Sequence, residues 1–207
     1  MSIATKQGDG GMTRLMYGEH VSKADLQVEA YGTIDELNAF LGMARSLCDD
    51  EWINRVLERL QRETFVVGAE LATPEEQLHK LKTRVDSAMI ATLDSEVQEI
   101  EALPNVLGDW ALPGATQAGA AIDMARVVCR RAERCVVRLS DNGALSNSEV
   151  LRYLNRLSDV LWLLGRRYEI AHHVDGALRP DYKGRNWSNS ASTNDKTERP
   201  TTVDKDK

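Results

Sequence analysis

Apolar residues recur along most of this chain at the spacing of an α-helix, and the pattern predicts five helices. Thr33 followed by Glu36 has the form of a capping box, so the first helix is expected to start there. Pro74 closes the second helix, and the Asn147 side chain can cap the last one. The predicted helices cover about 33–47, 51–72, 86–103, 117–139 and 147–172.

The remaining segments lack helical periodicity, and none has the alternation of a strand. Residues 1–31 are glycine-rich and polar, and the loop 104–116 holds two prolines and two glycines. The fold class predicted is therefore all-α, an up-and-down antiparallel bundle of five helices. We expect one domain over 1–178, with an N-terminal segment 1–31 and a helical bundle 32–172, and a polar disordered tail over 179–207.

Composition narrows the class of protein. Of the 207 residues, 42% are hydrophobic and 28% are charged, as in ordinary globular proteins. The net charge of -6 argues against a partner that is nucleic acid or a membrane surface. Three irregularly spaced cysteines predict neither a disulfide framework nor a zinc site. With no signal peptide or membrane span in the pattern, we expect a cytoplasmic protein.

The fourth predicted helix combines a buried stripe with five arginines. Arg126, Arg130 and Glu133 follow a line beside the apolar stripe, whereas Arg131, Arg134 and Arg138 lie further toward solvent. Guanidinium groups at the margin of a core need an anion, which is either a carboxylate of a neighbouring helix or a bound polyanion. The sequence of this helix alone does not decide between a neighbouring carboxylate and a bound polyanion. The stripe consists of Ile122, Ala125, Val128, Cys129, Ala132, Val136 and Leu139.

Polar residues beside the core of two other helices raise the same question. Asn155, Asp159, Trp162 and Arg166 share a stripe of the last helix, which favours structural pairing over ligand binding. Asp35, like Asn38, lies in the first turns of the first helix, where both interpretations stay open.

The N-terminal stretch TKQGDGGMTR, from Thr5 to Arg14, is a candidate anion cradle. Its glycines let backbone N–H groups converge on an anion, and Lys6 and Lys23 supply positive charge. The spacing is not that of a Walker A loop, and a glycine-rich N-terminus taken alone is more often flexible than functional. Two E-x-x-H pairs, at 76–79 and 169–172, resemble di-iron ligands in form, but neither is expected at a bundle centre, so no metal site is predicted.

Taken in order, these segments resemble the PduO-type corrinoid adenosyltransferases over about residues 5–170. The resemblance rests on several separated motifs in the right order, which are far more specific together than singly. They are TKQGDGGMT at 5–13 with Lys23, AYGTIDELN at 30–38, GAELA at 68–72, LPG at 112–114, the arginines and glutamate of 125–134, and NRLSD at 155–159.

The resemblance implies a homotrimer with active sites between subunits, which transfers the 5′-deoxyadenosyl group of ATP to cob(I)alamin and releases triphosphate. It implies Mg²⁺ with the ATP, and as partners a cob(II)alamin reductase and an adenosylcobalamin-dependent enzyme. Arg130 is implied to be catalytic, and Asp35 and Arg126 to meet across the subunit interface at the corrinoid. The ATP-binding residues implied are Thr5, Lys6, Gln7, Gly8, Thr13, Arg14, Lys23, Arg130, Arg131, Glu133, Arg134 and Asn155.

The resemblance also implies that an aromatic residue displaces the lower axial base of the corrinoid, which makes Co(II) easier to reduce. Family members usually carry Phe just before the Leu-Pro-Gly loop, whereas this chain has Trp110, so Trp110 is the candidate catalytic and corrinoid-binding residue. Family members usually carry a second glycine after the one that matches Gly114, whereas this chain has Ala115. The competing hypothesis is a carrier with the same bundle that binds ATP and corrinoid without forming a cobalt–carbon bond.

Overall fold

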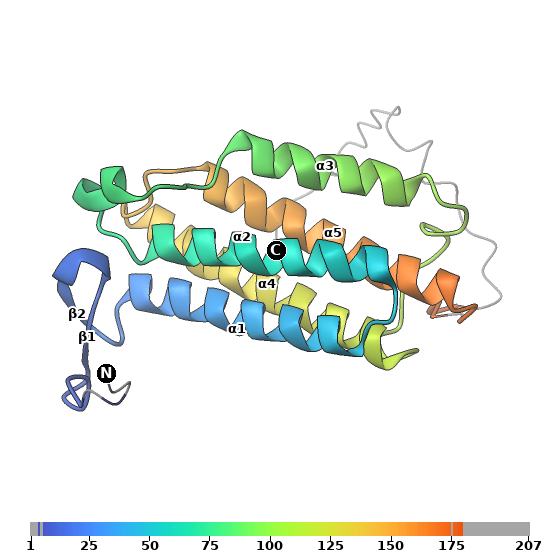
Figure 1. The fold of residues 1–207 in the computed structure, drawn as a ribbon, viewed down its shortest axis with the longest axis horizontal. Coiled ribbons are helices and arrows are strands. Elements are labelled where there is room, and N and C mark those ends of the chain that lie inside the picture. Colours follow the sequence, from blue (N-terminus) through green and yellow to red (C-terminus); the bar gives the residue numbers. More distant parts are fainter. Residues whose placement is uncertain (1–3, 5, 175, 180–207) are drawn as a thin grey trace, which may run out of the picture.

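The structure is a computed structural model that describes residues 4, 6–174 and 176–179. These residues form a bundle of long α-helices with a small β-hairpin at one end (Figure 1). Successive helices alternate in direction along the long axis (Figure 1). The elements are β1 Met12–Arg14, β2 His20–Ser22, α1 Leu26–Leu47, α2 Glu51–Leu71, α3 Ser87–Glu101, α4 Gln117–Asp141 and α5 Glu149–Ala171, with short 3-10 helices η1 Met16–Gly18 and η2 Glu75–Lys80.

The predicted start of the first helix is wrong. Helix α1 begins at Leu26, capped by the Asp25 carboxylate, which accepts a hydrogen bond from the Gln27 N–H at 2.8 Å. Thr33 lies inside the helix, and its hydroxyl donates to the Glu29 carbonyl oxygen at 2.7 Å. Packing of Ala30 and Ile34 in the core outweighs the low helix propensity of this stretch.

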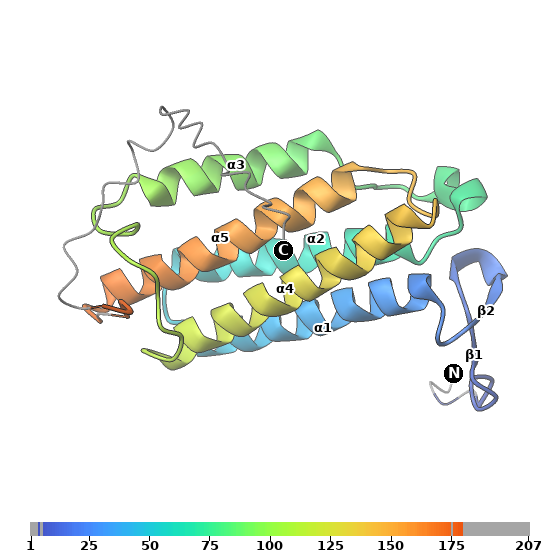
Figure 2. The same cartoon turned by 180° about the vertical axis from the view of Figure 1, so that it is seen from behind.

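The apolar stripe predicted for the fourth helix is confirmed, because all seven of its residues are buried. Helix α4 packs against α1 on one side and against α5 on the other, and Figure 2 shows α4 and α5 side by side. Complete burial of a side chain such as Ile122 or Leu154 contributes about 2 kcal/mol. The stripe therefore fixes the rotation of α4 and decides which of its arginines face outward.

Helix α3 packs mainly on α5, and charged groups join it to α2 as well. The Arg59 guanidinium bridges Glu63 of its own helix and Glu96 of α3, the latter at 2.7 Å. The fully buried Tyr153 of α5 donates to the Glu63 carboxylate at 2.7 Å, so one network links three helices. Burial raises the pKa of Glu96, and Arg59 opposes that shift.

The hairpin corrects the expectation of an all-α fold without strands. Strands β1 and β2 pair antiparallel with Thr13 opposite Val21. Each has only three residues, too few for an alternating pattern to be recognised in the sequence. The hairpin joins the bundle through the Met16 N–H, which donates to the carbonyl oxygen of Ala72 at 2.9 Å.

The loop that joins α3 to α4 lies at the opposite end of the bundle from the hairpin (Figure 1). At that same end the chain leaves α5, and Leu112 and Leu178 hydrogen-bond across to Gly176 and Trp110 respectively. Within the described residues, no helix is both long enough and apolar enough to cross a membrane.

Candidate functional site

The exposed face where α4 meets α5 carries two arginines that form no ion pair with a carboxylate of the described residues. Arg130 and Arg134 are exposed, and neither makes a hydrogen bond or ion pair with any described residue. Between them lies Glu133, whose carboxylate accepts a hydrogen bond from the Asn155 side chain of α5 at 3.1 Å. The structure thus brings together four of the five residues predicted to bind ATP from these two helices.

The other arginines of α4 have partners within the chain. Arg131 pairs with Glu36 of α1, and Arg138 pairs with Glu29 of α1 at 2.9 Å. Both pairs are about half exposed, so each contributes little to stability. Arg131, which was predicted to bind ATP, is therefore held toward α1 by a carboxylate in this chain.

Arg126 has a partner that the sequence analysis missed. It pairs with Asp123 one turn earlier in α4, with Nε 2.9 Å from the carboxylate, and Asp123 is nearly buried. The i, i+3 spacing of the two residues in the sequence is the feature that indicates such a pair, because residues three apart are neighbours on a helix. The predicted contact between Arg126 and Asp35 is not made within one chain.

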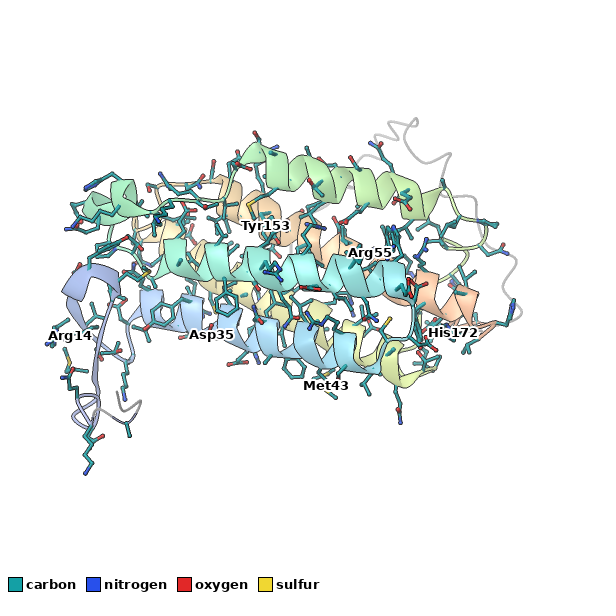
Figure 3. All side chains as sticks on the ribbon, viewed as in Figure 1. Arg14, Asp35, Met43, Arg55, Tyr153 and His172 are labelled. Carbon is teal, nitrogen blue, oxygen red and sulfur yellow. The ribbon has the colours of Figure 1, made fainter. Side chains whose placement is uncertain are left out.

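Asp35 lies part-way along α1, on the side that faces α2 (Figure 3). Its carboxylate is exposed and makes no hydrogen bond or ion pair in the described part of the chain. It lines a cavity of about 240 Å³ together with Tyr31, Asn38 and Phe65. Asn38 is structural, because its amide clamps α1 to α2 through the Gln61 carbonyl oxygen at 2.8 Å and the Thr64 hydroxyl at 2.7 Å.

The glycine-rich segment before β1 folds into tight turns around Lys23. The Gly11 N–H donates to the Gly8 carbonyl oxygen at 3.2 Å, and the Lys23 N–H donates to the Gly11 carbonyl oxygen at 2.9 Å. A Cβ at Gly8 would lie 2.8 Å from the Lys23 ammonium, so the lysine side chain reaches close to the backbone of the glycine segment. The Lys23 ammonium thus lies beside the glycine segment, and its role in binding an anion stays a prediction.

The other predicted residues of this segment surround the same turns. Lys6, with φ of 58°, and Gln7 are exposed, as is Arg14 at the end of β1 (Figure 3). Thr13 is half-buried in the hairpin. Thr5 lies outside the described residues, as does the predicted tail beyond Arg179. Among the described residues, no hydrogen bond or ion pair joins residues 6–23 to α4 or α5.

Polar residues further along α5 divide between surface and core. Asp159 pairs with Arg156 at 3.2 Å, and burial raises the pKa of Asp159 against the opposing charges of Arg156 and Arg130. Arg166, predicted on the same stripe, is instead buried in an ion pair with Glu169 at 2.5 Å. The carboxylate of Glu169, which forms the E-x-x-H pair with His172, is thus paired with a guanidinium group. Among the described residues, no cluster of three or more metal-ligating side chains occurs.

Trp110 lies in the loop between α3 and α4 and is 60% exposed. Next to it, the Asp109 side chain is 3% exposed and accepts a hydrogen bond from the Arg179 guanidinium at 2.6 Å. That hydrogen bond lowers the pKa of Asp109. The sequence analysis did not identify this ion pair, because its residues are 70 positions apart and Arg179 was assigned to the tail.

The fold is a helical bundle, and the exposed guanidinium groups of Arg130 and Arg134 on the face between α4 and α5 are of a kind that suits a polyanion such as a chain of phosphates. Residues 3–168 match the family model described as cobalamin adenosyltransferase. This chain belongs to the cobalamin adenosyltransferase family.

Named relatives agree with the family assignment. The chain is 36% identical to the corrinoid adenosyltransferase of Citrobacter freundii over 83% of this chain and 97% of that protein. It is 37% identical to the corrinoid adenosyltransferase PduO of Salmonella typhimurium over 86% of this chain, but it spans only 53% of that protein. This chain therefore matches about half the length of the Salmonella relative.

Solved structures resemble the whole bundle. A variant of a PduO-type ATP:corrinoid adenosyltransferase from Lactobacillus reuteri, complexed with cobalamin and ATP, is similar with a TM-score of 0.78 and 33% identity. The match covers 87% of this chain and 100% of that one. Another variant, complexed with ATP, has the same TM-score at 31% identity, with 86% of this chain and 99% of that one covered.

Proposed function

We propose that this chain transfers the 5′-deoxyadenosyl group of ATP to the cobalt of cob(I)alamin, forming adenosylcobalamin and inorganic triphosphate. The observation that carries the proposal is a pair of exposed arginines, Arg130 and Arg134, which make no hydrogen bond or ion pair with a described residue, on one face of a member of this family. Such guanidinium groups suit a triphosphate, whose oxygens accept two parallel hydrogen bonds from each.

The reaction needs no nucleophilic side chain. Co(I) attacks C5′ of ATP, the cobalt–carbon bond forms with the cobalt electron pair, and the C5′–oxygen bond breaks with its electron pair passing to triphosphate. The protein has to hold C5′ in line with cobalt and stabilise the charge on the leaving group. Arg130 and Arg134 serve the second task, while Glu133 and Asn155 orient the nucleotide beside them.

The glycine segment would close over the phosphates with the Lys23 ammonium. Lys6, Gln7, Gly8, Thr13 and Arg14 belong to this part of the site, and Thr5 and Arg131 are assigned to it from the resemblance alone. Mg²⁺ fits the same arrangement, because it is usually held by phosphate oxygens and one or two carboxylates and keeps several waters. Glu133 is the carboxylate on this face that would serve, and Mg²⁺ would neutralise phosphate charge.

The proposed assembly is a homotrimer with sites between subunits, and the positions of these parts support sites that are shared between chains. The glycine segment and the Trp110 loop lie at opposite ends of a bundle whose first helix, at 22 residues, is about 30 Å long (Figure 1). ATP and corrinoid must meet within bonding distance, so the two segments of one site have to come from different chains. Exposed apolar side chains on both faces suit such packing: Met43 and Phe65 on α1 and α2, and Met124 and Val127 on α4.

The same packing offers Asp35 a partner. Its carboxylate lacks one within the described chain, and Arg126 of a neighbouring subunit is the proposed contact at the corrinoid. Trp110 would occupy the space of the lower axial base. Reduction of Co(II) to Co(I) requires an electron donor, for which a cob(II)alamin reductase is the proposed partner, and an adenosylcobalamin-dependent enzyme in the cytoplasm would take the product.

The test is anaerobic incubation of the purified chain with chemically reduced cob(I)alamin, ATP and Mg²⁺, followed by absorbance for adenosylcobalamin. We expect turnover and the release of one triphosphate for each cobalt–carbon bond. If the chain binds both ATP and cobalamin but forms no such bond, it is a carrier and the proposed activity is wrong. Light-scattering mass measurement tests the trimer separately.

A further inference from the structure

The loop that carries Trp110 is paired with the last described residues of the chain. The Leu178 N–H donates to the Trp110 carbonyl oxygen at 2.7 Å, and the Leu112 N–H donates to the Gly176 carbonyl oxygen at 2.8 Å. Ala111 and Ala177 form an antiparallel bridge between these two hydrogen bonds. We call residues 176–179 the strap, since they hold the loop by its backbone.

An ion pair fastens the far end of the strap. Arg179 donates to the Asp109 carboxylate three times, from its backbone N–H at 2.9 Å, from Nε at 3.3 Å and from a terminal guanidinium nitrogen at 2.6 Å. The Asp109 side chain is nearly inaccessible, so its charge depends on these hydrogen bonds in place of water. Asp109 directly precedes Trp110, and a movement of the pair would move Trp110.

The near end of the strap rests on a buried ion pair. Glu169 and Arg166 are 2% and 6% exposed, and the Val174 N–H donates to the Glu169 carbonyl oxygen at 2.9 Å. A Cβ at Gly176 would lie 2.2 Å from the Glu169 carboxylate and 2.9 Å from the Arg166 guanidinium, so glycine alone fits here. The strap therefore lies against a buried ion pair at its near end and is joined to Asp109 at its far end, and the loop is paired along its length.

This pairing orients the exposed apolar side chains of the loop and strap. Alternate residues of a strand share a face, and residues directly opposite each other in an antiparallel pair also share one. Trp110, Leu112 and Leu178 therefore project from one face, while Ala111 and Ala177 project from the other. The three large side chains are 60%, 60% and 51% exposed, so they add apolar surface at this end of the bundle.

We propose that Asp109 and Arg179 are positioning residues, which fix the strap on the loop so that Trp110 stands where it excludes the lower axial base of the corrinoid. This inference rests on the proposed function of Trp110. A loop with two prolines and two glycines has no helix or sheet of its own to hold an indole in place. Displacing a ligand requires a side chain held to within a fraction of an ångström, and the ion pair supplies that restraint.

The experiment compares Asp109→Asn, Arg179→Gln and Arg179→Lys with the parent chain. The matched control is Arg152→Gln, which removes an exposed arginine pair of 2.7 Å with Glu149 at the other end of α5. With cob(II)alamin and ATP, the four-coordinate Co(II) signal should fall about tenfold in the first two variants, as expected for loss of one charged hydrogen bond. Arg179→Lys, which keeps a charge and the backbone donor, should retain an intermediate signal.

Two further measurements separate positioning from folding or nucleotide binding. The ATP dissociation constant of each variant should stay within about twofold of the parent, because the ion pair lies far from the arginines of α4. Hydrogen exchange should accelerate at the Leu112 and Leu178 amides and not in the helices. The control variant should change none of these readouts.

The outcomes distinguish this inference from the proposed function. If the parent chain forms no adenosylcobalamin, the proposed function fails, and unchanged amide exchange in the variants would then refute the strap itself. If the parent is active and Asp109→Asn and Arg179→Gln keep the parent Co(II) signal, the positioning role is refuted while the function stands. Loss of ATP binding together with that signal would also count against it.

Discussion

Replacement of Arg130 by alanine tests the polyanion site most directly. Arg130 is exposed and makes no hydrogen bond or ion pair with a described residue, so Arg130→Ala removes no such bond from the described part of the chain. Alanine is also a better helix former. Surface changes of this kind alter the free energy of unfolding by about 0.5 kcal/mol or less, so the variant should fold normally.

The effect on catalysis should be much larger. A donor aimed at developing charge typically contributes about 10²–10³ in kcat. If Arg130 meets the departing triphosphate, kcat should fall by about that factor, and kcat/KM for ATP should fall at least as far because the interaction strengthens in the transition state. Arg130→Ala should therefore leave the free energy of unfolding almost unchanged, while it raises the activation free energy of the reaction by about 3–4 kcal/mol.

Arg138→Ala is the matched control, because it removes the same side chain from the same helix but breaks a half-exposed pair with Glu29. It should lower the free energy of unfolding by about 1 kcal/mol or less and leave turnover unchanged. Both variants are assayed anaerobically with cob(I)alamin, ATP and Mg²⁺, and unfolded with urea. Parent turnover in Arg130→Ala would refute its role, and equal losses in both variants would mean that the arginines act only through general charge.

Three other changes probe separate parts of the molecule. Trp110→Ala should leave ATP binding intact and abolish the four-coordinate Co(II) signal; an unchanged signal would assign base displacement to another residue. A chain ending at Arg179 should remain active and assembled, whereas one ending at Val174 should fold but lose that signal; equal activity of the two would contradict a role for the strap. Burial and a hydrogen bond to Asp49 raise the pKa of Tyr168 from near 10 to about 12. The contribution of Tyr168 to stability is therefore present below pH 10 and lost between pH 10 and about 12. When the free energy of unfolding is measured with urea across this pH range, this loss should be absent in Tyr168→Phe.

The bundle could be predicted because its helices carry strong periodic stripes. In α4 the apolar residues form a single continuous line, and α3 begins after Asp86 as expected, with the Asp86 carboxylate accepting from the Met89 N–H at 3.0 Å. The start of α1 was missed because a capping-box sequence occurs inside the helix. There the Thr33 hydroxyl bonds back to its own helix, and a cap and a back-bond look alike in sequence.

The candidate site was predictable only as a set of charged positions. A helical wheel places Arg131, Arg134 and Arg138 together on the outer side of α4. In the fold, Arg131 and Arg138 lie over α1 and pair with its glutamates, whereas Arg134 has no such partner among the described residues. Which arginine meets a carboxylate depends on the helix packed beside it, and a single sequence does not contain that distance.

The division of the arginines also bears on assembly. Those that pair with α1 are already neutralised, so the positive charge left over is concentrated at Arg130 and Arg134, beside Glu133. On the face of α1 and α2, Asp35 is an exposed carboxylate that makes no hydrogen bond or ion pair with a described residue, next to the exposed Phe65. A monomer thus carries uncompensated charges of opposite sign, together with exposed apolar side chains, on different faces. A contact between those two faces would be heterologous, because each chain would contribute a different surface. A closed assembly built from heterologous contacts is a ring, and a trimer with sites shared between neighbours is such a ring.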